Sequence, residues 1–165
     1  MTPSNIVLVI TATTTALIAG LFYAWSWSVT PGIGRLSDVE YVRAMQAMND
    51  AILNPVFFAT FLGTAVLLPI CTYMHYTQPV STRFWFLLAA TIIYLIGVMG
   101  VTMGGNVPLN EALKAFDVDG ASAQEIAAQR LKFEGPWNGL QGIRAFANFL
   151  SIVLVIIACI SPKDH

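Results

Sequence analysis

Four long apolar blocks divide this sequence, and Arg144 is the only Asp, Glu, Lys or Arg residue within them. An α-helix needs about 20 residues to cross the hydrocarbon core of a bilayer, and each block is long enough. In the whole chain only 10% of the residues are charged, whereas a typical soluble domain has about 25%. The sequence therefore predicts an all-α fold, a single-domain integral membrane four-helix bundle over residues 1–165. We place its spans at residues 6–29, 55–76, 84–103 and 140–160.

The charge balance limits the partners that such a chain can have. The net charge is −1 and the isoelectric point is about 6.0, so no basic patch is available for a nucleic acid. We expect membrane lipid and a lipophilic small molecule as partners, and a homo-oligomer stays open. Cys71 and Cys159 both lie inside apolar blocks, which favours buried free thiols over a disulfide.

Four spans divide the rest of the chain between two sides of the membrane. Both tails and a short connection at 77–83 share one side, the plain side, while the larger segments 30–54 and 104–139 share the other, the elaborated side. The elaborated side has more Lys and Arg residues, but it also carries eight acids and is much longer. The positive-inside rule is therefore indecisive, and our expectation is that both termini are cytoplasmic.

Each elaborated segment contains a helix-start signal. Ser37 and Glu40 have the spacing of a capping box, and Ser122 and Glu125 repeat it. The first signal predicts an amphipathic helix between spans 1 and 2, lying on the membrane surface or over the mouth of the bundle. The second segment should be partly helical, with a turn or helix around 108–116, a loop at 117–120 and a helix over about 122–133. The apolar face of the first helix would consist of Tyr41, Met45, Met48 and Ile52.

Small residues recur along the first three spans at the spacing of one helix face. Such residues let helices approach closely in lipid, where burial of apolar surface does not drive association. We expect them to pack helices together within or between bundles. They are Ala12, Ala16, Gly20, Ala24, Ala59, Gly63, Gly100 and Gly104.

The fourth span carries the strongest candidate site. Trp137, Gln141, Arg144, Asn148 and Ser151 follow one another at spacings of four, three, four and three, which places them on one helix stripe. A guanidinium facing lipid is costly, so such residues usually point into a bundle or a wet cavity. The alternative is that Arg144, about one turn inside the span, reaches the headgroups. Its polar neighbours above and below favour the inward orientation.

Asparagines gather at the same membrane face. Asn49 interrupts the apolar side of the first surface helix, and Asn54 precedes the second span. Asn106 and Asn110 flank Pro108 in a predicted turn just beyond the third span. Helix capping is the structural alternative for each asparagine, and the better one for Asn54. With the Arg144 stripe they predict a polar pocket at the elaborated mouth of the bundle.

The titratable residues narrow the chemistry. The two histidines, His75 and His165, lie on the plain side and at the terminus, so we expect no metal site and no haem ligation. Glu111 is the best candidate acid or base, although an acid at a helix start is an equal alternative. Asp50 shares a polar face with Arg43 and is expected to be solvated. We therefore expect no cofactor.

The two asparagine segments resemble a known family. Three features are similar to the anthrone oxygenase-like membrane family. They are the run YVRAMQAMNDAILNPVFFATF, the later run GGNVPLNEAL, and a Trp before an arginine-bearing last span. The similarity extends over essentially the whole chain. Most members are bacterial proteins of unknown function, which implies a bacterial inner membrane here. The best-known members oxidise anthrones to anthraquinones without a metal or organic cofactor. The positions that match are Asn49, Asn54, Pro55, Asn106, Pro108, Asn110 and Arg144.

Two functions follow as hypotheses. The first is a cofactor-independent oxygenase acting on a lipophilic aromatic or quinol-like molecule. The second is a non-enzymatic lipid- or quinone-binding module or accessory subunit that uses the same pocket. Trp25 and Trp27 can offer a stacking surface, but interfacial anchoring is the favoured role for both. We assign catalysis to Arg144, Asn106, Asn110 and Glu111, and ligand binding to Asn49, Asn54, Trp137, Gln141 and Asn148.

Overall fold

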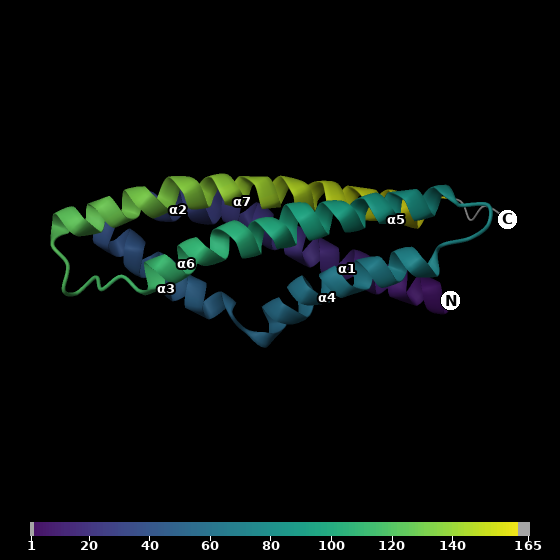
Figure 1. The fold of residues 1–165 in the computed structure, drawn as a ribbon, viewed down its shortest axis with the longest axis horizontal. Helices are drawn as coiled ribbons and strands as arrows, with labels where there is room; N and C mark the ends of the chain where they lie inside the picture. The colour runs from purple at the N-terminus through teal and green to yellow at the C-terminus, as the bar shows by residue number, and fades with distance from the viewer. Residues whose placement is uncertain (1, 162–165) are drawn as a thin grey trace.

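The computed structural model describes residues 2–161, and within them every regular element is a helix. Four helical stretches are long and apolar enough to cross a membrane, which confirms the predicted all-α integral membrane protein. They lie side by side as an elongated bundle, with the short connection between the second and third stretches at one end and the larger segments at the other (Figure 1). The four stretches are Pro3–Ile33, Pro55–Met74, Thr82–Lys114 and Ala123–Ile160.

The first stretch is longer than the predicted span. Helix α1 (Pro3–Ala24) continues without a break through a π-helical turn, η1 (Trp25–Val29), into α2 (Thr30–Ile33). Thr30 supports this wide turn, because its hydroxyl donates a hydrogen bond to the carbonyl of Trp25 at 2.9 Å. Turns of this kind are common at functional sites. Here the turn carries Trp25 and Ser26 to the end of the bundle where the larger segments lie.

Helix α3 (Asp38–Ile52) is the predicted amphipathic helix, and it begins at the predicted capping box. The Glu40 carboxylate accepts hydrogen bonds from the backbone N–H and hydroxyl of Ser37, and these bonds lower the pKa of Glu40. On its apolar face Tyr41 and Met45 are buried. The helix packs on α6 and α7, over the mouth of the bundle.

The second and third stretches meet at the plain end. Helix α4 (Pro55–Met74) is capped by Asn54. The third stretch is one continuous rod of α5 (Thr82–Ile93), η2 (Tyr94–Gly100), η3 (Thr102–Asn106) and α6 (Val107–Lys114).

Of the turn or helix predicted around 108–116, the helix is present, because the third stretch stays helical past Pro108. The π-helical turn η3 ends just before Pro108, so the chain stays helical up to that point. Proline is tolerated in the first turn of the α-helix that follows. The consequence is that Asn106 and Asn110 project from a rigid helix, one turn apart, instead of from a loop.

The last helix also differs from the prediction. The separate helices expected over about 122–133 and 140–160 form a single helix, α7 (Ala123–Ile160), which runs through Pro136. At about 1.5 Å per residue α7 is about 57 Å long, nearly twice the hydrocarbon core of a bilayer at about 30 Å. Its first third therefore projects beyond the membrane. The predicted capping box at Ser122 and the loop before it are confirmed.

The buried residues form two clusters. One fills the membrane-spanning bundle and includes Ile18, Leu68, Leu87 and Tyr94. The other lies at the elaborated end, between α3, α6 and the first part of α7, and we call these three elements the cap. Its buried members are Tyr41, Val42, Met45, Leu113, Val118, Ile126, Phe133 and Trp137.

Arg130 ties the cap together. Its guanidinium donates hydrogen bonds to the carbonyls of Gly34 and Leu36, at 2.8 Å each, and pairs with Asp38 and Glu134 at 3.0 and 2.7 Å. The guanidinium carbon lies 4.4 Å from the centroid of the buried Tyr41 ring. Burial raises the pKa of the Tyr41 phenol. These contacts join the end of the first stretch, the start of α3 and α7 in one unit.

Close helix approach occurs at glycines other than those predicted. A Cβ on Gly97 would lie 2.7 Å from the Ala147 Cβ, and a Cβ on Gly105 would lie 2.7 Å from Leu140. In contrast, Gly20, Gly63 and Gly104 would meet nothing within 4 Å. The third stretch thus packs tightly on α7, whereas the small stripe from Ala16 to Ala24 faces outward.

The outer surface is suited to lipid. Large apolar side chains are exposed along all four stretches, for example Val66, Ile96, Phe149 and Ile160. Both cysteines are free, but only Cys71 is buried, because Cys159 faces outward near the end of α7. The chain is an integral membrane protein whose spans contact lipid directly.

Candidate functional site

A cavity of about 250 Å³ opens inside the bundle, at the junction of the membrane span and the cap. All four membrane stretches and α3 contribute to its wall. Most of the lining is apolar, with a few polar groups among it. The lining residues are Leu21, Phe22, Trp25, Asn49, Ile52, Leu53, Phe57, Phe58, Phe61, Leu62, Thr102, Met103, Val107, Asn110, Trp137 and Arg144.

Arg144 is the only titratable side chain among these lining residues. It points inward, as its polar neighbours predicted, and is 9% exposed. Its Nε donates to Gln141 Oε1 at 2.6 Å, and its Nη1 makes a long contact of 3.5 Å with the Thr102 hydroxyl. No carboxylate in residues 2–161 forms an ion pair with it. The guanidinium thus has donors directed at the cavity and no anionic partner.

Aromatic rings enclose this guanidinium. Its central carbon lies 4.6 Å from the Phe22 ring centroid and 5.2 Å from that of Trp137. The Trp25 ring lies 5.6 Å from Trp137, and Phe57 stacks on Phe61 at 5.1 Å. Contacts between a cation and ring faces are favourable and strengthen when water is excluded. The rings therefore hold the charge in place without neutralising it.

The two asparagines of the third stretch position Trp137. The indole Nε1–H of Trp137 donates to Asn110 Oδ1 at 2.7 Å. The Asn106 amide donates to the backbone carbonyl of Trp137 at 3.4 Å. Because both asparagines project from one rigid helix, they fix the indole plane against the cavity.

Several buried amide atoms at and below the cavity have no hydrogen-bond partner within residues 2–161. They include Nδ2 of Asn49, Oδ1 of Asn106 and both side-chain polar atoms of Asn148. Such atoms are costly unless water or a ligand satisfies them. Asn49 lines the cavity, whereas Asn148 lies one helical turn deeper, on the Arg144 stripe. The wall of the cavity therefore has unused hydrogen-bonding capacity at Asn49.

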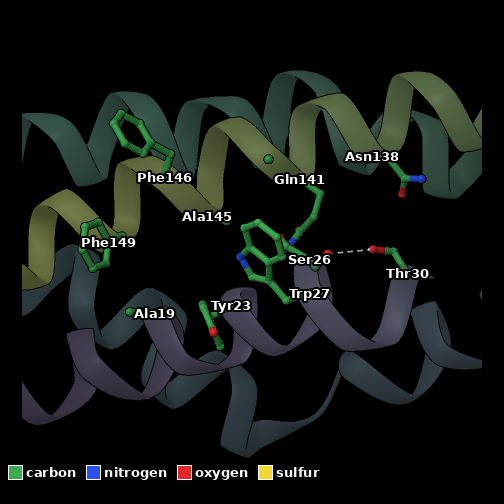
Figure 2. Close-up of a pocket in the computed structure, with 11 residues that line it drawn as sticks. Ala19, Tyr23, Ser26, Trp27, Thr30, Asn138, Gln141, Ala145, Phe146 and Phe149 are labelled. Carbon is green, nitrogen blue, oxygen red and sulfur yellow. Dashed lines mark hydrogen bonds between the residues drawn. The ribbon is translucent and has the colours of Figure 1, made fainter. Parts of the chain in front are cut away.

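A second hollow of about 480 Å³ lies on the outer face, between the first stretch and α7, and we call it the outer groove (Figure 2). Gln141 separates the outer groove from the cavity. Its side chain reaches from α7 toward Ser26, and its amide donates to the Ser26 hydroxyl at 3.1 Å and to the Phe22 carbonyl at 3.0 Å. The oxygen of the same amide accepts from Arg144. Gln141 thus orients Arg144 while being anchored on the first stretch.

The structure brings together part of the predicted site. Arg144, Trp137, Asn110 and Asn49 line the cavity, and Gln141 and Asn106 directly support it. Three predicted residues lie elsewhere. Asn54 caps α4 by accepting from the Phe57 N–H at 3.0 Å, Glu111 is exposed on α6, and Asn148 is buried beneath the cavity.

Other lining residues escaped sequence reasoning. Phe22 and Thr102 sit in ordinary apolar runs, and nothing in their local pattern distinguishes them from core residues. Trp25, for which interfacial anchoring was favoured, packs against Trp137 on the cavity wall, while Trp27 is exposed in the outer groove. Residues two apart point to nearly opposite sides of a helix, so one tryptophan faces inward when the other faces outward, and the sequence does not say which.

The donor set for metals is sparse. Within residues 2–161, no three His, Cys, Asp or Glu side chains gather as a potential metal site.

Comparison with known proteins identifies the family. The family model described as Anthrone oxygenase matches residues 55–154, from the start of α4 into the last third of α7. The match omits Asn49 and the first stretch, so it is narrower than the resemblance noted in the sequence. No curated protein and no solved structure matches the chain. Since the matched range covers more than half of its residues, the chain belongs to the anthrone oxygenase family.

Proposed function

We propose that this membrane protein binds a lipophilic phenol or enolisable polycyclic ketone in the cavity, as its oxyanion, and promotes oxidation of that anion by molecular oxygen. The observation that carries the proposal is the buried Arg144 guanidinium, which has aromatic walls and no carboxylate partner in the described part of the chain. A buried charge normally requires a counter-charge. A ligand oxyanion supplies one.

The size and chemistry of the wall fit such a ligand. Aromatic rings face each other more favourably in offset or tilted arrangements, and Trp25, Trp137 and Phe61 present such faces to the cavity. The Asn49 amide lacks a partner and can donate to a second oxygen of the ligand. The rest of the lining excludes water.

The proposed step uses the protein electrostatically. Arg144 stabilises the enolate or phenolate, so the ligand releases its proton more readily, and no protein base lines the cavity. In an anthrone, the electron-rich ring carbon then bonds to one atom of oxygen, giving a peroxide that takes up a proton. Loss of water from this peroxide leaves a carbonyl. In total a methylene group loses two hydrogens, one oxygen atom enters the quinone, and the other leaves as water.

Oxygen consumption provides the test. Purified protein in lipid nanodiscs is supplied with anthrone at neutral pH, and quinone formation is measured above a heat-denatured control. With isotopically labelled oxygen gas, each quinone should gain one labelled atom. Arg144→Gln should lower the rate by about 100-fold or more, the usual effect of removing an oxyanion-stabilising donor. A matched change on the lipid face, Ile96→Ala, should leave the rate unchanged.

A second candidate is a non-enzymatic binding module for a lipid or quinol. The lack of a protein base in the cavity favours it. Quenching of tryptophan fluorescence measures binding independently of turnover, because Trp25 and Trp137 lie on the wall. Saturable binding that depends on Arg144, with no quinone formed above the denatured control, would establish the binding module and reject the oxygenase.

A further inference from the structure

The cavity opens sideways, toward the hydrocarbon of the membrane. Four of its lining residues are exposed, with between 40 and 59% of each residue accessible. They come from two facing walls. One wall is the first half of α4 together with Leu53 just before it, and the other is η3. We call this opening the side mouth, and its residues are Leu53, Phe58, Leu62 and Met103.

The packing of the helices explains why the side mouth exists. Helix α4 packs along α1, α5 and the beginning of η2, whereas η3 and α6 pack on α7. At the elaborated end α4 therefore diverges from the third stretch, and in Figure 1 the junction of α3 and α4 lies well away from α6. The π-helical turn η3 turns Thr102 and Asn106 toward α7 and leaves Met103 outside.

The side mouth lies within the membrane and not in water. Leu62 follows the start of α4 by seven residues, or about 10 Å of helix. It and Met103 belong to apolar stretches that cross the bilayer. All four residues of the side mouth are uncharged and apolar. Such an opening is solvated by acyl chains.

The opposite route, from water, is closed by the cap. Tyr41, Met45 and Leu113 are each at most 1% exposed, and Trp137 is 2% exposed. Phe133 stacks on Trp137 with their ring centroids 6.0 Å apart. A ligand entering from the aqueous side would have to separate this packed cluster.

The volume of the cavity limits how much of a ligand can be enclosed. The cavity holds about 250 Å³, slightly below the roughly 300–1,000 Å³ of pockets that enclose a drug-sized ligand. A ligand with a ring held against Arg144 and a long apolar substituent cannot be fully enclosed. The substituent can extend only through the side mouth.

We propose that the ligand is an amphiphile dissolved in the bilayer, which enters between α4 and η3 with its acidic hydroxyl leading and leaves its apolar tail in the side mouth. This inference rests on the proposed binding of an oxyanion at Arg144. It adds the substrate class, a phenol or enol with a long apolar substituent, and the route by which that substrate arrives.

A chain-length series of para-alkylphenols tests the proposal. Binding to protein in nanodiscs is measured by tryptophan quenching for para-methylphenol through para-dodecylphenol, and each affinity is corrected for partition into protein-free nanodiscs. With an open side mouth, the corrected affinity should hold or rise as the chain lengthens. A sharp loss of affinity once the tail exceeds the cavity would overturn the proposal.

Two variants narrow the side mouth from opposite walls. Leu62→Trp and Met103→Trp should each weaken dodecylphenol by at least about tenfold, while changing methylphenol much less. Ile96→Trp is the control, because Ile96 is exposed on the same third stretch and does not line the cavity. Equal affinities for dodecylphenol in wild type and both side-mouth variants would also overturn the proposal.

The same series separates the side mouth from the oxyanion site. Arg144→Gln should weaken every phenol by a similar factor, because it removes the contact to the shared hydroxyl. If Arg144→Gln has no effect while the side-mouth variants act on long tails, the oxyanion proposal fails and the route stands. Elution as a single species from size-exclusion chromatography checks folding, and either side-mouth variant suffices if the other does not fold.

Discussion

Two arginines in this protein are both stacked on aromatic rings, yet they have opposite surroundings. Arg130 in the cap lies over Tyr41 and donates to two carbonyls and two carboxylates. Arg144 in the cavity lies over Phe22, and its hydrogen-bond acceptors are one amide oxygen and one distant hydroxyl. Both side chains come from α7, four helical turns apart.

The difference separates a structural arginine from one that is available to a ligand. A guanidinium has five donors in a fixed plane, and in Arg130 these donors are used to join chain segments far apart in sequence. In Arg144 only Nε makes a short hydrogen bond, to Gln141, so the donors that remain are available to a molecule that enters the cavity. The neighbouring rings are similar in both places, which means that the acceptors, and not the stacking, distinguish the two roles.

Removal of the cavity charge should produce the largest effect. Arg144→Gln is expected to lower anthrone oxidation by about 100- to 1,000-fold, while the melting temperature stays the same or rises because a buried unpaired charge is lost. Initial rates and thermal unfolding in detergent measure the two quantities. The oxidation rate of Arg144→Lys should lie between those of the wild type and Arg144→Gln, since lysine keeps the charge without the planar stacking. A large loss of melting temperature would instead make Arg144 structural.

A carboxylate placed beside Arg144 should give this arginine an ion pair like those that Arg130 makes in the cap. Gln141→Glu is expected to pair with Nε of Arg144 and compete with the ligand oxyanion, which should weaken phenol binding by roughly tenfold to 100-fold. Gln141→Leu removes the acceptor without adding charge and should weaken binding less. Similar effects of the two variants would mean that Gln141 acts only by shape.

Arg130→Gln should break the cap and leave the chemistry of the cavity intact. Loss of several charge-assisted hydrogen bonds is expected to lower stability by about 2 kcal/mol, with faster amide exchange in α3. The rate per folded molecule should change little. If Arg130→Gln were as stable as the wild type and as inactive as Arg144→Gln, the distinction between the two arginines would be lost.

The support of Trp137 should have a smaller effect. Asn110→Ala leaves the indole N–H without its partner and should weaken phenol binding by roughly fivefold, which corresponds to about 1 kcal/mol for one hydrogen bond. Fluorescence anisotropy should show a more mobile tryptophan. Asn110→Ser keeps an oxygen that can accept this hydrogen bond, adds no charge to the cavity, and is the matched control for position.

The smallest effect is expected at the adjacent carboxylate. Glu111 is exposed on α6 and does not line the cavity, so Glu111→Gln should change the oxidation rate by less than about twofold, as for most surface substitutions. The pH dependence of the rate tests it directly. A loss comparable with Arg144→Gln would restore Glu111 as a base and require a route from it to the ligand.

Sequence reasoning worked best where a feature depends on neighbours in the chain. The spacing from Trp137 to Ser151 predicted one inward stripe, and Trp137, Gln141, Arg144, Asn148 and Ser151 are all buried. Capping boxes at Ser37 and Ser122 were also found correctly. Helix periodicity and capping involve residues only three or four positions apart, which is why the sequence reveals them.

It failed where distant segments decide the outcome. Separate helices were predicted over about 122–133 and 140–160, and a span that ends at residue 103, but in the structure the third stretch continues through Pro108 and α7 continues through Pro136. The stripe from Ala16 to Ala24 faces outward, so its packing between bundles stays a prediction, and the close contacts within the bundle form at Gly97 and Gly105. Small size permits close approach, but the partner helix selects which small residues are used.

The sequence alone predicts that this protein lies in a bilayer, that it has four spans, and that a single charged residue, Arg144, lies within them. Hydropathy and helical spacing are sufficient for these, because a bilayer imposes length and polarity on each helix separately. The packing of the helices determines the rest: within residues 2–161 no carboxylate pairs with Arg144, Asn110 holds Trp137, and α4 diverges from η3 to open the side mouth. Each of these depends on distances between residues far apart in the chain, which are set when the helices pack.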